Sequence, residues 1–408
     1  MAKDNVFVGL DVGSTKVAAT CGSIVEGMVN ISGFVRVPND GVRRGVVTDI
    51  ESTVSSVSEA LSKLETVSGT HIRSAVVGIS GPHISTSLSH GVVAVSRADG
   101  EITATDVERV LEAARTVALP PNREIIHVMP RSFTVDGQQG VNDPVGMTGI
   151  RLEVEALVIG GATSAIKNLT KCVYQAGLEI DDLVFSPLTT AQSILNKKQK
   201  EIGVALVDIG GGTTSLVVYE EGDILHASVL PIGSGHITND IAIGLRISVE
   251  TAEKIKIKFG SAIPDKIREA ETISLSQFDP GETQRIERKY TSEIIQARLG
   301  EIFALISSEL KKIGKDGMLP AGVVLTGGGS KLEDLVEATR EELRLPAEIG
   351  KQIFEMGGFV DKLSDPLYAT SVGLLVYAFE NAEKKYRGSS SGGDIVGRAK
   401  NFFKQFLP

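Results

Sequence analysis

The fold is decided by the stretch VALVDIGGGTT, residues 204–214. Its continuous apolar beginning predicts a strand that is buried on both faces. Asp208 ends the apolar run, and three glycines and two threonines follow it. Glycine lets a backbone come close to a ligand, the N–H groups of such a turn suit a phosphate, and the acid can hold Mg²⁺ through water. Together with a hairpin over 215–230, the stretch predicts a phosphate-binding loop, and a buried hairpin with a glycine-rich bend is the alternative.

A similar stretch, VGLDVGSTK, lies at residues 8–16. It has the same order of apolar strand, acid (Asp11), glycine and hydroxyl residues, and it also leads into a strand, 17–24, and a return strand, 29–37. A repeat on this scale, about half the chain apart, indicates two similar lobes. Two such loops facing each other across a cleft would clamp a triphosphate from both sides.

A third glycine-rich loop and one helix complete the predicted cleft. GVVLTGGGSK, residues 322–331, is again a strand that runs into glycines, here followed by a helix, and its backbone would form a floor for a base or ribose. Upstream, Ser248 is a candidate N-cap for a helix that ends at Gly260. Glu253 and Lys256 lie on one face of this helix, where we expect them to hydrogen-bond a ribose.

These features together resemble the actin-like ATPase superfamily, and the similarity spans residues 6 to about 380. Members of that superfamily usually insert a small subdomain after the first hairpin, but here only residues 38–47 precede the next predicted helix, 49–67. Residues 83–156, after Gly81-Pro82, look inserted instead. This rearrangement, and the stretch SDPLYAT at 364–370, resemble the FtsA family of bacterial actin-like cell-division proteins. PilM, a pilus-assembly protein, shares the rearrangement and stays as the near alternative.

The resemblance implies an α/β, actin-like (ribonuclease H-like) duplicated fold with two lobes around a nucleotide cleft. The predicted units are two discontinuous lobes, an inserted subdomain in each, a linker and a terminal helix. They cover the first lobe at 1–82 and 157–195 with its insertion at 83–156, the second lobe at 196–233 and 301–386 with its insertion at 234–300, the flexible linker at 387–393, and the helix at 394–408. Within the first insertion we expect short strands at 84–88 and 91–95 and a strand at 150–155, and we expect the main fold to resume at 156–161.

The three loops and the helix face supply the predicted binding residues for ATP and Mg²⁺. Asp11 and Asp208 are the predicted metal ligands. The predicted nucleotide-binding residues are Asp11, Gly13, Ser14, Thr15, Lys16, Asp208, Gly210, Gly211, Gly212, Thr213, Thr214, Glu253, Lys256, Gly327, Gly328, Gly329 and Ser330.

No catalytic residue is predicted. MreB-like proteins and the chaperone ATPases of the superfamily place a glutamate just before the proline that opens the helix after 178–185, where it helps to orient the attacking water. Here that position is Ser186, before Pro187, and Gln192, one turn further along, is a weak substitute. We therefore expect an ATP-binding protein with slow or negligible hydrolysis.

Composition excludes several other classes of protein. The net charge of −9 argues against a general nucleic-acid binder. Cys21 and Cys172 lie in apolar surroundings and read as reduced core residues, which makes a disulfide framework or a cysteine zinc site unexpected. Neither a signal peptide nor a transmembrane run is visible, so we expect a cytoplasmic protein. The sequence has no Walker A, Rossmann glycine or HExxH motif, and no GxSxG elbow between a strand and a helix.

The last fifteen residues, 394–408, predict a basic amphipathic helix. No acid follows Asp394, and the preceding RGSSSGG reads as a flexible tether. Such a helix suits the surface of an anionic membrane, and a last helix docked on the parent fold is the alternative. The predicted apolar stripe is Ile395, Ala399, Phe402, Phe403 and Phe406, flanked by Val396 and Leu407, and the predicted basic residues are Arg398, Lys400 and Lys404.

The resemblance implies a protein that binds ATP, assembles into filaments and tethers FtsZ, a tubulin-like protein, to the cytoplasmic face of the membrane at the division site. The implied partners are FtsZ, further copies of this chain, anionic lipid and other cell-division proteins, but no nucleic acid. The surface for FtsZ would lie in the second insertion. A sugar-kinase-type phosphotransferase is a weaker alternative because it needs a catalytic carboxylate and a polar sugar pocket. A chaperone ATPase would need a peptide-binding domain, for which residues after 386 leave no room.

Overall fold

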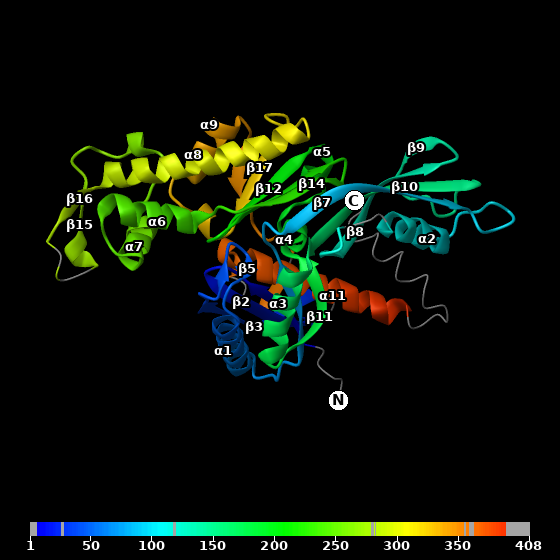
Figure 1. The fold of residues 1–408 in the computed structure, drawn as a ribbon, viewed down its shortest axis with the longest axis horizontal. Helices are drawn as coiled ribbons and strands as arrows, with labels where there is room; N and C mark the ends of the chain where they lie inside the picture. Colours follow the sequence, from blue (N-terminus) through cyan, green and yellow to red (C-terminus); the bar gives the residue numbers. More distant parts are fainter. Residues whose placement is uncertain are drawn as a thin grey trace.

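The computed structural model describes residues 6–25, 28–116, 120–278, 281, 283–354, 356–358 and 363–388 (Figure 1). The predicted membrane helix, and the predicted linker from residue 389 onward, lie outside these residues. Two lobes form the centre of the molecule, and an inserted unit extends from each of them toward opposite ends (Figure 1). The described part of the chain contains no helix that is both long and apolar enough to cross a bilayer.

The first lobe is built on a six-stranded sheet in the order β11-β6-β1-β2-β3-β19. Helices α1 (Ile50–Ser68) and α3 (Thr163–Gln175) pack beside each other, and α11 (Ala369–Gly388) packs against β1, β2 and β6. The strands are β1 (Phe7–Val12), β2 (Lys16–Val25), β3 (Met28–Pro38), β6 (Ser74–Ile79), β11 (Glu179–Phe185) and β19 (Met356–Gly358). Because α11 continues to Gly388, it includes the first two residues of the predicted linker.

The second lobe repeats this arrangement. Its sheet has the order β14-β13-β12-β17-β18, so β12 is antiparallel to β13 and parallel to β17, as β1 is to β2 and β6. The strands are β12 (Val204–Ile209), β13 (Thr214–Glu220), β14 (Asp223–Leu230), β17 (Val323–Thr326) and β18 (Ala347–Ile349). The predicted duplication of an α/β unit is confirmed. Helices α4 (Ser186–Ile194) and α5 (Lys197–Ile202) connect the lobes, and Asn196 caps the start of α5.

The first inserted unit is a four-stranded sheet, β7-β10-β8-β9, with α2 (Ala104–Arg115) packed on it. Its strands are β7 (Ile84–Ala94), β8 (Arg123–Val135), β9 (Gln138–Val141) and β10 (Arg151–Ala162). Two expectations were wrong here. The two short strands at 84–88 and 91–95 are the single strand β7, and residues 156–161 belong to β10 of the inserted sheet, so the predicted boundary at 156 falls inside a strand.

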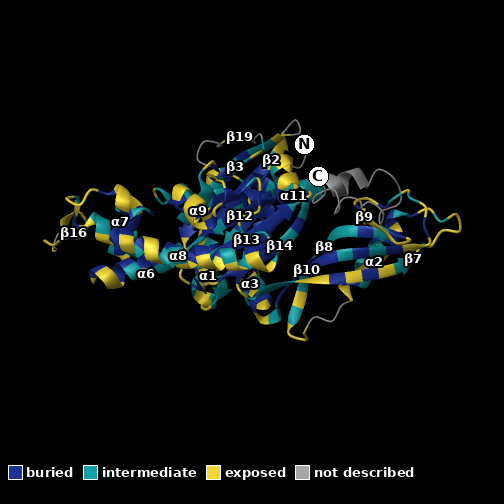
Figure 2. Ribbon diagram, turned by 90° about the horizontal axis from the view of Figure 1, so that it is seen from above, coloured by how far each residue is buried: buried dark blue, intermediate teal, exposed yellow. Residues whose placement is uncertain are grey.

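Burial explains the wrong boundary. From Arg151 to Glu155 the buried residues of β10 alternate with less buried ones, whereas residues 156–161 are all buried. In this second part Leu157 and Ile159 share one core with Phe185 of the first lobe and Leu206 of the second. Figure 2 shows that the centre of the molecule, around β12 and β13, is mostly buried. The change from an alternating to a continuous apolar pattern marks where the strand becomes covered on both faces, not where the inserted unit ends.

The second inserted unit holds α6 (Ser234–Leu245), α7 (Val249–Phe259) and the small sheet of β15 (Thr272–Ser274) and β16 (Arg285–Glu287). Helix α8 (Arg288–Lys312) begins in this unit and continues across the second lobe, so the predicted boundary at 300 lies inside a helix. The remaining helix of this lobe is α9 (Leu335–Leu343), and the short 3-10 turns are η1 (Pro264–Lys266), η2 (Leu275–Gln277), η3 (Gly328–Lys331) and η4 (Pro366–Tyr368). The unit shares one continuous core with the lobe.

Candidate functional site

The two predicted phosphate loops have the same backbone turn. In the first loop the N–H of Gly13 donates to the carbonyl of Lys16 at 2.9 Å, and in the second the N–H of Gly210 donates to that of Thr213, also at 2.9 Å. Each turn closes the hairpin that begins with the strand carrying the acid, β1 or β12. The internal repeat in the sequence is therefore also a repeat in local structure.

The structure brings the two loops into direct contact. A Cβ atom added to Gly211 would lie 2.4 Å from Cγ2 of Thr15, and one added to Gly212 would lie 2.6 Å from Oγ of Ser14. Real Cβ atoms do not come so close to other heavy atoms, so a side chain at either glycine would push the lobes apart. Glycine is required here for the approach of one loop to the other, as well as for any approach to a ligand.

Asp11 and Asp208 are the last residues but one of β1 and β12, and both are half-buried. Burial raises the pKa of Asp11 to about 6, the Asp208 carboxylate adds to the rise, and Lys16 opposes it. Burial also raises the pKa of Asp208, against the effects of Lys16 and of a 3.4 Å hydrogen bond from the hydroxyl of Thr370. Two half-buried carboxyls whose pKa values are both raised fit a site that a bound cation completes.

The donor set also fits a hydrated magnesium ion. No group of three or more His, Cys, Asp or Glu side chains in the described residues is placed to hold a metal. Asp11 and Asp208 would therefore supply only part of a coordination shell. Mg²⁺ commonly binds through one or two carboxylates and takes its other ligands from water and substrate phosphates.

Lys16 is fixed beside the two acids. Its ammonium donates to the carbonyl of Leu367 and lies 5.9 Å from the centre of the Tyr368 ring. Burial lowers the pKa of Lys16, while Asp11 and Asp208 oppose that change. The segment around η4 thus reaches from the second lobe to the first phosphate loop, and Lys331 of the third loop holds its other end through Asp365 at 2.5 Å.

Glu253 and Lys256 lie together on α7, as predicted from their spacing. Their side chains form an ion pair at 2.6 Å, and the Lys256 ammonium also donates to Thr238 at 2.8 Å and to the carbonyl of Ser234 at 3.2 Å. Burial lowers the pKa of Lys256, and Glu253 opposes this. The N–H of Ser234 in turn donates to the carbonyl of Gly210 at 2.8 Å. The helix face is therefore connected to the second phosphate loop through the start of α6.

The third loop packs on the second. A Cβ atom on Gly327 would lie 2.1 Å from a carboxylate oxygen of Asp208, and one on Gly329 would lie 2.5 Å from Cγ2 of Ile209. Ser330 is buried, and its hydroxyl donates to the carbonyl of Gly327 at 2.8 Å. In this structure Ser330 therefore supports the shape of the loop, and the glycine backbone of 327–329 forms the surface.

The region after β6 and β11 is where a water-orienting group is expected. Ser186 is buried, and its hydroxyl oxygen would lie 2.4 Å from a Cβ atom on Gly78, the residue paired with Asp11 in the sheet. The weak substitute Gln192 is placed elsewhere, because its amide donates to Glu380 of α11 at 2.5 Å. That idea was wrong, since on this helix the side chain of residue 192 faces α11.

Sequence reasoning missed Ser80 and Ser215. Their hydroxyl oxygens lie 3.3 Å apart and join the two lobes. Ser80 follows β6 directly, and Ser215 follows the second phosphate loop. The only signal is that each hydroxyl residue comes just after a predicted strand or phosphate loop; because β6 and β13 belong to different sheets, no strand pairing predicts their contact.

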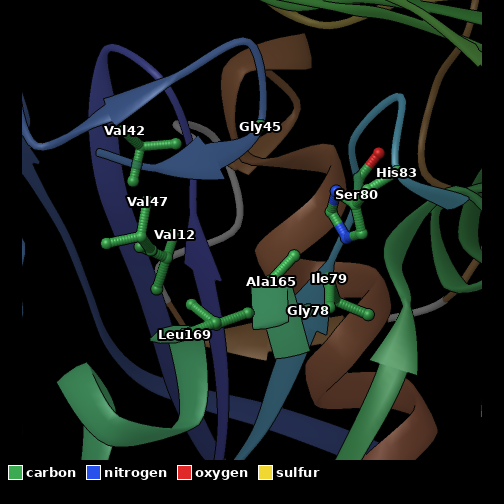
Figure 3. A pocket seen from close by; sticks show the side chains of 10 residues that line it. All are labelled: Val12, Val42, Gly45, Val47, Gly78, Ile79, Ser80, His83, Ala165 and Leu169. Atoms are coloured by element: carbon green, nitrogen blue, oxygen red, sulfur yellow. The ribbon is translucent and has the colours of Figure 1, made fainter. Parts of the chain in front are cut away.

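Sequence reasoning also missed His83 and the small cavity beside it (Figure 3). The cavity measures about 10 Å³, room for about one water. Its lining includes Val12, Gly45, Gly78 and Ser80. Both ring nitrogens of His83 are buried without a hydrogen-bond partner among the described residues. Burial, together with Arg123, lowers the pKa of His83 to about 4, so the ring is neutral at pH 7.

Comparison with known proteins assigns the family. A family profile described as "Cell division protein FtsA" matches residues 205–373, and one described as "SHS2 domain inserted in FTSA" matches residues 81–160. The cell division protein FtsA of Pseudomonas aeruginosa is 39% identical over 388 residues, which are 95% of this chain and 92% of that protein. The chain belongs to the FtsA family. Its FtsA relatives in Bacillus subtilis and Escherichia coli are 37% and 32% identical and cover 94% and 98% of the chain, or 85% and 98% of their own lengths.

Solved structures agree with the FtsA assignment at the level of the fold. A PilM–PilN type IV pilus biogenesis complex matches with a TM-score of 0.66 at 16% identity, covering 91% of this chain and 98% of that one. MreB5 of Spiroplasma citri bound to ADP matches with a TM-score of 0.54 at 15% identity, covering 95% and 99%. These likenesses show the actin-like two-lobed fold. The family profile of the inserted domain, residues 81–160, covers the sheet of β7, β8, β9 and β10.

Proposed function

We propose that this protein is an actin-like ATP-binding cell-division protein that polymerises at the cytoplasmic membrane and tethers FtsZ to it. Membership of the FtsA family supports a role in cell division together with division partners and copies of itself. The contact between the two phosphate loops carries the nucleotide part of the proposal. Two turns with the same backbone hydrogen bond meet between the lobes at Gly211, Gly212, Ser14 and Thr15.

Each part of the cleft would have a separate task. The N–H groups of residues 13–15 and 210–213 would bind the phosphates, and Asp11 and Asp208 would hold Mg²⁺ through water. When bound, the ion neutralises phosphate charge and bridges phosphate oxygens. Glu253, whose side chain is 44% exposed, would accept hydrogen bonds from the ribose, and Lys256 would orient that carboxylate through their ion pair. The backbone of 327–329 would support the base.

Hydrolysis would be slow, on the order of minutes per turnover or longer, against a usual enzyme rate of about 10 s⁻¹. The reason is the absence of a carboxylate at Ser186 and the engagement of Gln192 by Glu380. Bound ATP would then act mainly as a switch for assembly. A protein that uses ATP to control its assembly fits membership of the FtsA family. A sugar kinase would instead need a catalytic carboxylate in the same region.

The membrane part of the proposal rests on residues 394–408, which lie outside the described residues. Their basic amphipathic pattern would place the protein on the inner leaflet at the division site. FtsZ and other division proteins would bind elsewhere, and for FtsZ we propose the second inserted unit, which the family resemblance implies.

The test combines calorimetry with vesicle pelleting. The full chain should bind ATP with Mg²⁺ and should pellet with anionic vesicles more completely when ATP is present. FtsZ should pellet with it only when the full chain is added. If the chain binds no nucleotide, the proposed role of ATP is wrong. If it does not bring FtsZ to the vesicles, the proposed link between FtsZ and the membrane is wrong.

A further inference from the structure

A strained arginine lies where the two phosphate loops meet. Strands β4 (Val42–Arg43) and β5 (Val46–Val47) form a hairpin whose turn is Arg44-Gly45. Both turn residues have positive φ, 49° for Arg44 and 74° for Gly45, as in a type I′ turn. Such turns favour Asn, Asp or Gly at the first position, because other side chains are strained there. The hairpin therefore keeps an arginine where asparagine would be more stable.

The tip of this hairpin is wedged between both phosphate loops. The N–H of Gly45 donates to the hydroxyl of Ser14 in the first loop at 2.9 Å. In the second loop, a Cβ atom on Gly212 would lie 3.0 Å from the backbone nitrogen of Arg44. On a third side Gly45 packs so closely that an added Cβ would lie 2.4 Å from the carbonyl oxygen of Ser80 (Figure 3). The backbone of Arg44 is thus fixed at the phosphate site even though its side chain is exposed.

The charge of Arg44 has no protein partner in the described part of the chain, in either a hydrogen bond or an ion pair. The two lysines predicted to bind the nucleotide are engaged: Lys16 donates to Leu367, and Lys256 is paired with Glu253. An unpaired guanidinium on a backbone fixed by both phosphate loops is suited to an oxyanion that binds there. Guanidinium binds phosphate with two parallel hydrogen bonds, which a lysine ammonium does not reproduce.

We propose that Arg44 binds the terminal phosphate of a nucleoside triphosphate held between the two loops, and so makes the protein distinguish triphosphate from diphosphate. The inference rests on the proposed nucleotide binding and adds a sensor to it. Strain at a residue that contacts a ligand site is a recognised sign of function, and here the strain fixes the root of the side chain. When the third phosphate is absent, Arg44 loses its partner, and the hairpin tip loses one of its links to the second lobe.

The test is calorimetric titration of the full chain with Mg-ATP and Mg-ADP. Arg44→Asn suits the turn better and should not lower the melting temperature, but it should weaken ATP binding by about 10-fold or more while ADP binding changes less than about 2-fold. Arg44→Lys should lie between the two because it keeps the charge but not the fork. The matched control is Arg43→Asn, which removes the same charge one residue earlier and should leave the ratio of ATP to ADP affinity unchanged.

Two results would overturn the assignment. If Arg44→Asn keeps the wild-type ratio of affinities, or if Arg43→Asn lowers that ratio equally, Arg44 is not the sensor. A wild-type chain that binds neither nucleotide would overturn the proposed nucleotide binding as well, so the two failures can be told apart.

Discussion

Several residues of the candidate site have surroundings that should destabilise the folded protein unless a ligand is bound. Among the described residues neither Asp11 nor Asp208 has a salt-bridge partner, although both are half-buried and burial raises the pKa of each carboxyl. Gly211 and Gly212 give up side-chain contacts so that the loops can touch. Neither arrangement benefits a protein with an empty cleft. Both are reasonable where a magnesium ion and phosphates complete the site.

The charge of Asp208 should be needed for magnesium-dependent binding of ATP. Asp208→Asn keeps the shape of the side chain but removes the charge that would hold Mg²⁺. We expect ATP affinity in the presence of Mg²⁺ to fall by about 10-fold or more, and affinity in EDTA to change little. Asp223→Asn is the control, because burial also raises the pKa of Asp223, to about 7, but it lies at the β13–β14 turn. Equal magnesium dependence in wild type and Asp208→Asn would contradict the assigned metal site.

His127 predicts a pH dependence of stability. It is buried, its Nε2 accepts the N–H of Phe185 at 3.0 Å, and burial lowers its pKa to about 4. An unfolded chain binds a proton at this residue near pH 6.5, before the native state does, so the free energy of unfolding falls as the pH drops from about 6.5 toward 4. Lowering the pH from about 7.5 to 5.5 should therefore lower the free energy of unfolding by about 1.4 kcal/mol through His127 alone.

His127→Gln keeps an acceptor for Phe185 and cannot be protonated. Urea unfolding at the two pH values should show a smaller loss for this variant than for wild type, by about the same 1.4 kcal/mol. Because His83 contributes equally to both proteins, it cancels in the comparison. Identical losses would show that His127 is not the group responsible.

At the scale of elements, the sequence predicted most accurately those helices that have clear caps. Helix α1 (Ile50–Ser68) begins after Asp49, which accepts the N–H of Ser52, and it is capped by Gly69 with φ of 67°; the predicted range, 49–67, differs by one residue at each end. Helix α7 similarly lies between Ser248 and Gly260. Strand β10 was divided wrongly because burial by distant segments changes the apolar pattern, and no local residue records that.

The two glycine-rich turns were predicted from the order of apolar strand, acid and glycines, but their mutual contact was not. Gly211→Ala should force them apart, since the new Cβ would lie 2.4 Å from Cγ2 of Thr15, and ATP affinity should fall by about 10-fold. Thr15→Ser removes that methyl group and keeps the hydroxyl, so the double variant should recover part of the lost affinity when measured by calorimetry. A Gly211→Ala protein that binds ATP normally, or a double variant no better than the single one, would mean that the loops need not touch.

At the scale of the molecule, duplication could be predicted from the sequence, but the coupling between units could not. The repeated strand, acid and glycine pattern was sufficient to predict two lobes. Nothing in the local pattern shows that the first inserted unit packs on both lobes. It does so through Leu157 and Ile159 in the shared core and through a 3.1 Å hydrogen bond from Thr86 to the carbonyl of Ala227. Long-range contacts of this kind depend on the completed fold.

The last prediction concerns attachment of the whole molecule to a membrane through residues 394–408. Each phenylalanine of the apolar stripe would contribute about 1.5–3 kcal/mol if fully buried, less at an interface, and each basic residue adds about 1 kcal/mol near anionic lipid. Part of this is lost in ordering the helix, so a single tail should bind reversibly. A filament that carries many tails should bind far more tightly.

Deletion of 394–408, or Phe402→Glu with Phe406→Glu, should leave ATP binding intact and release the protein from anionic vesicles in a pelleting assay. The matched control is Asn401→Glu with Gln405→Glu, which adds the same two charges to the polar face. Since the control keeps the apolar stripe, it should weaken binding in a way that low salt reverses, whereas the phenylalanine variant should stay unbound. If the deleted protein still pellets with vesicles as the full chain does, residues 394–408 are not the anchor.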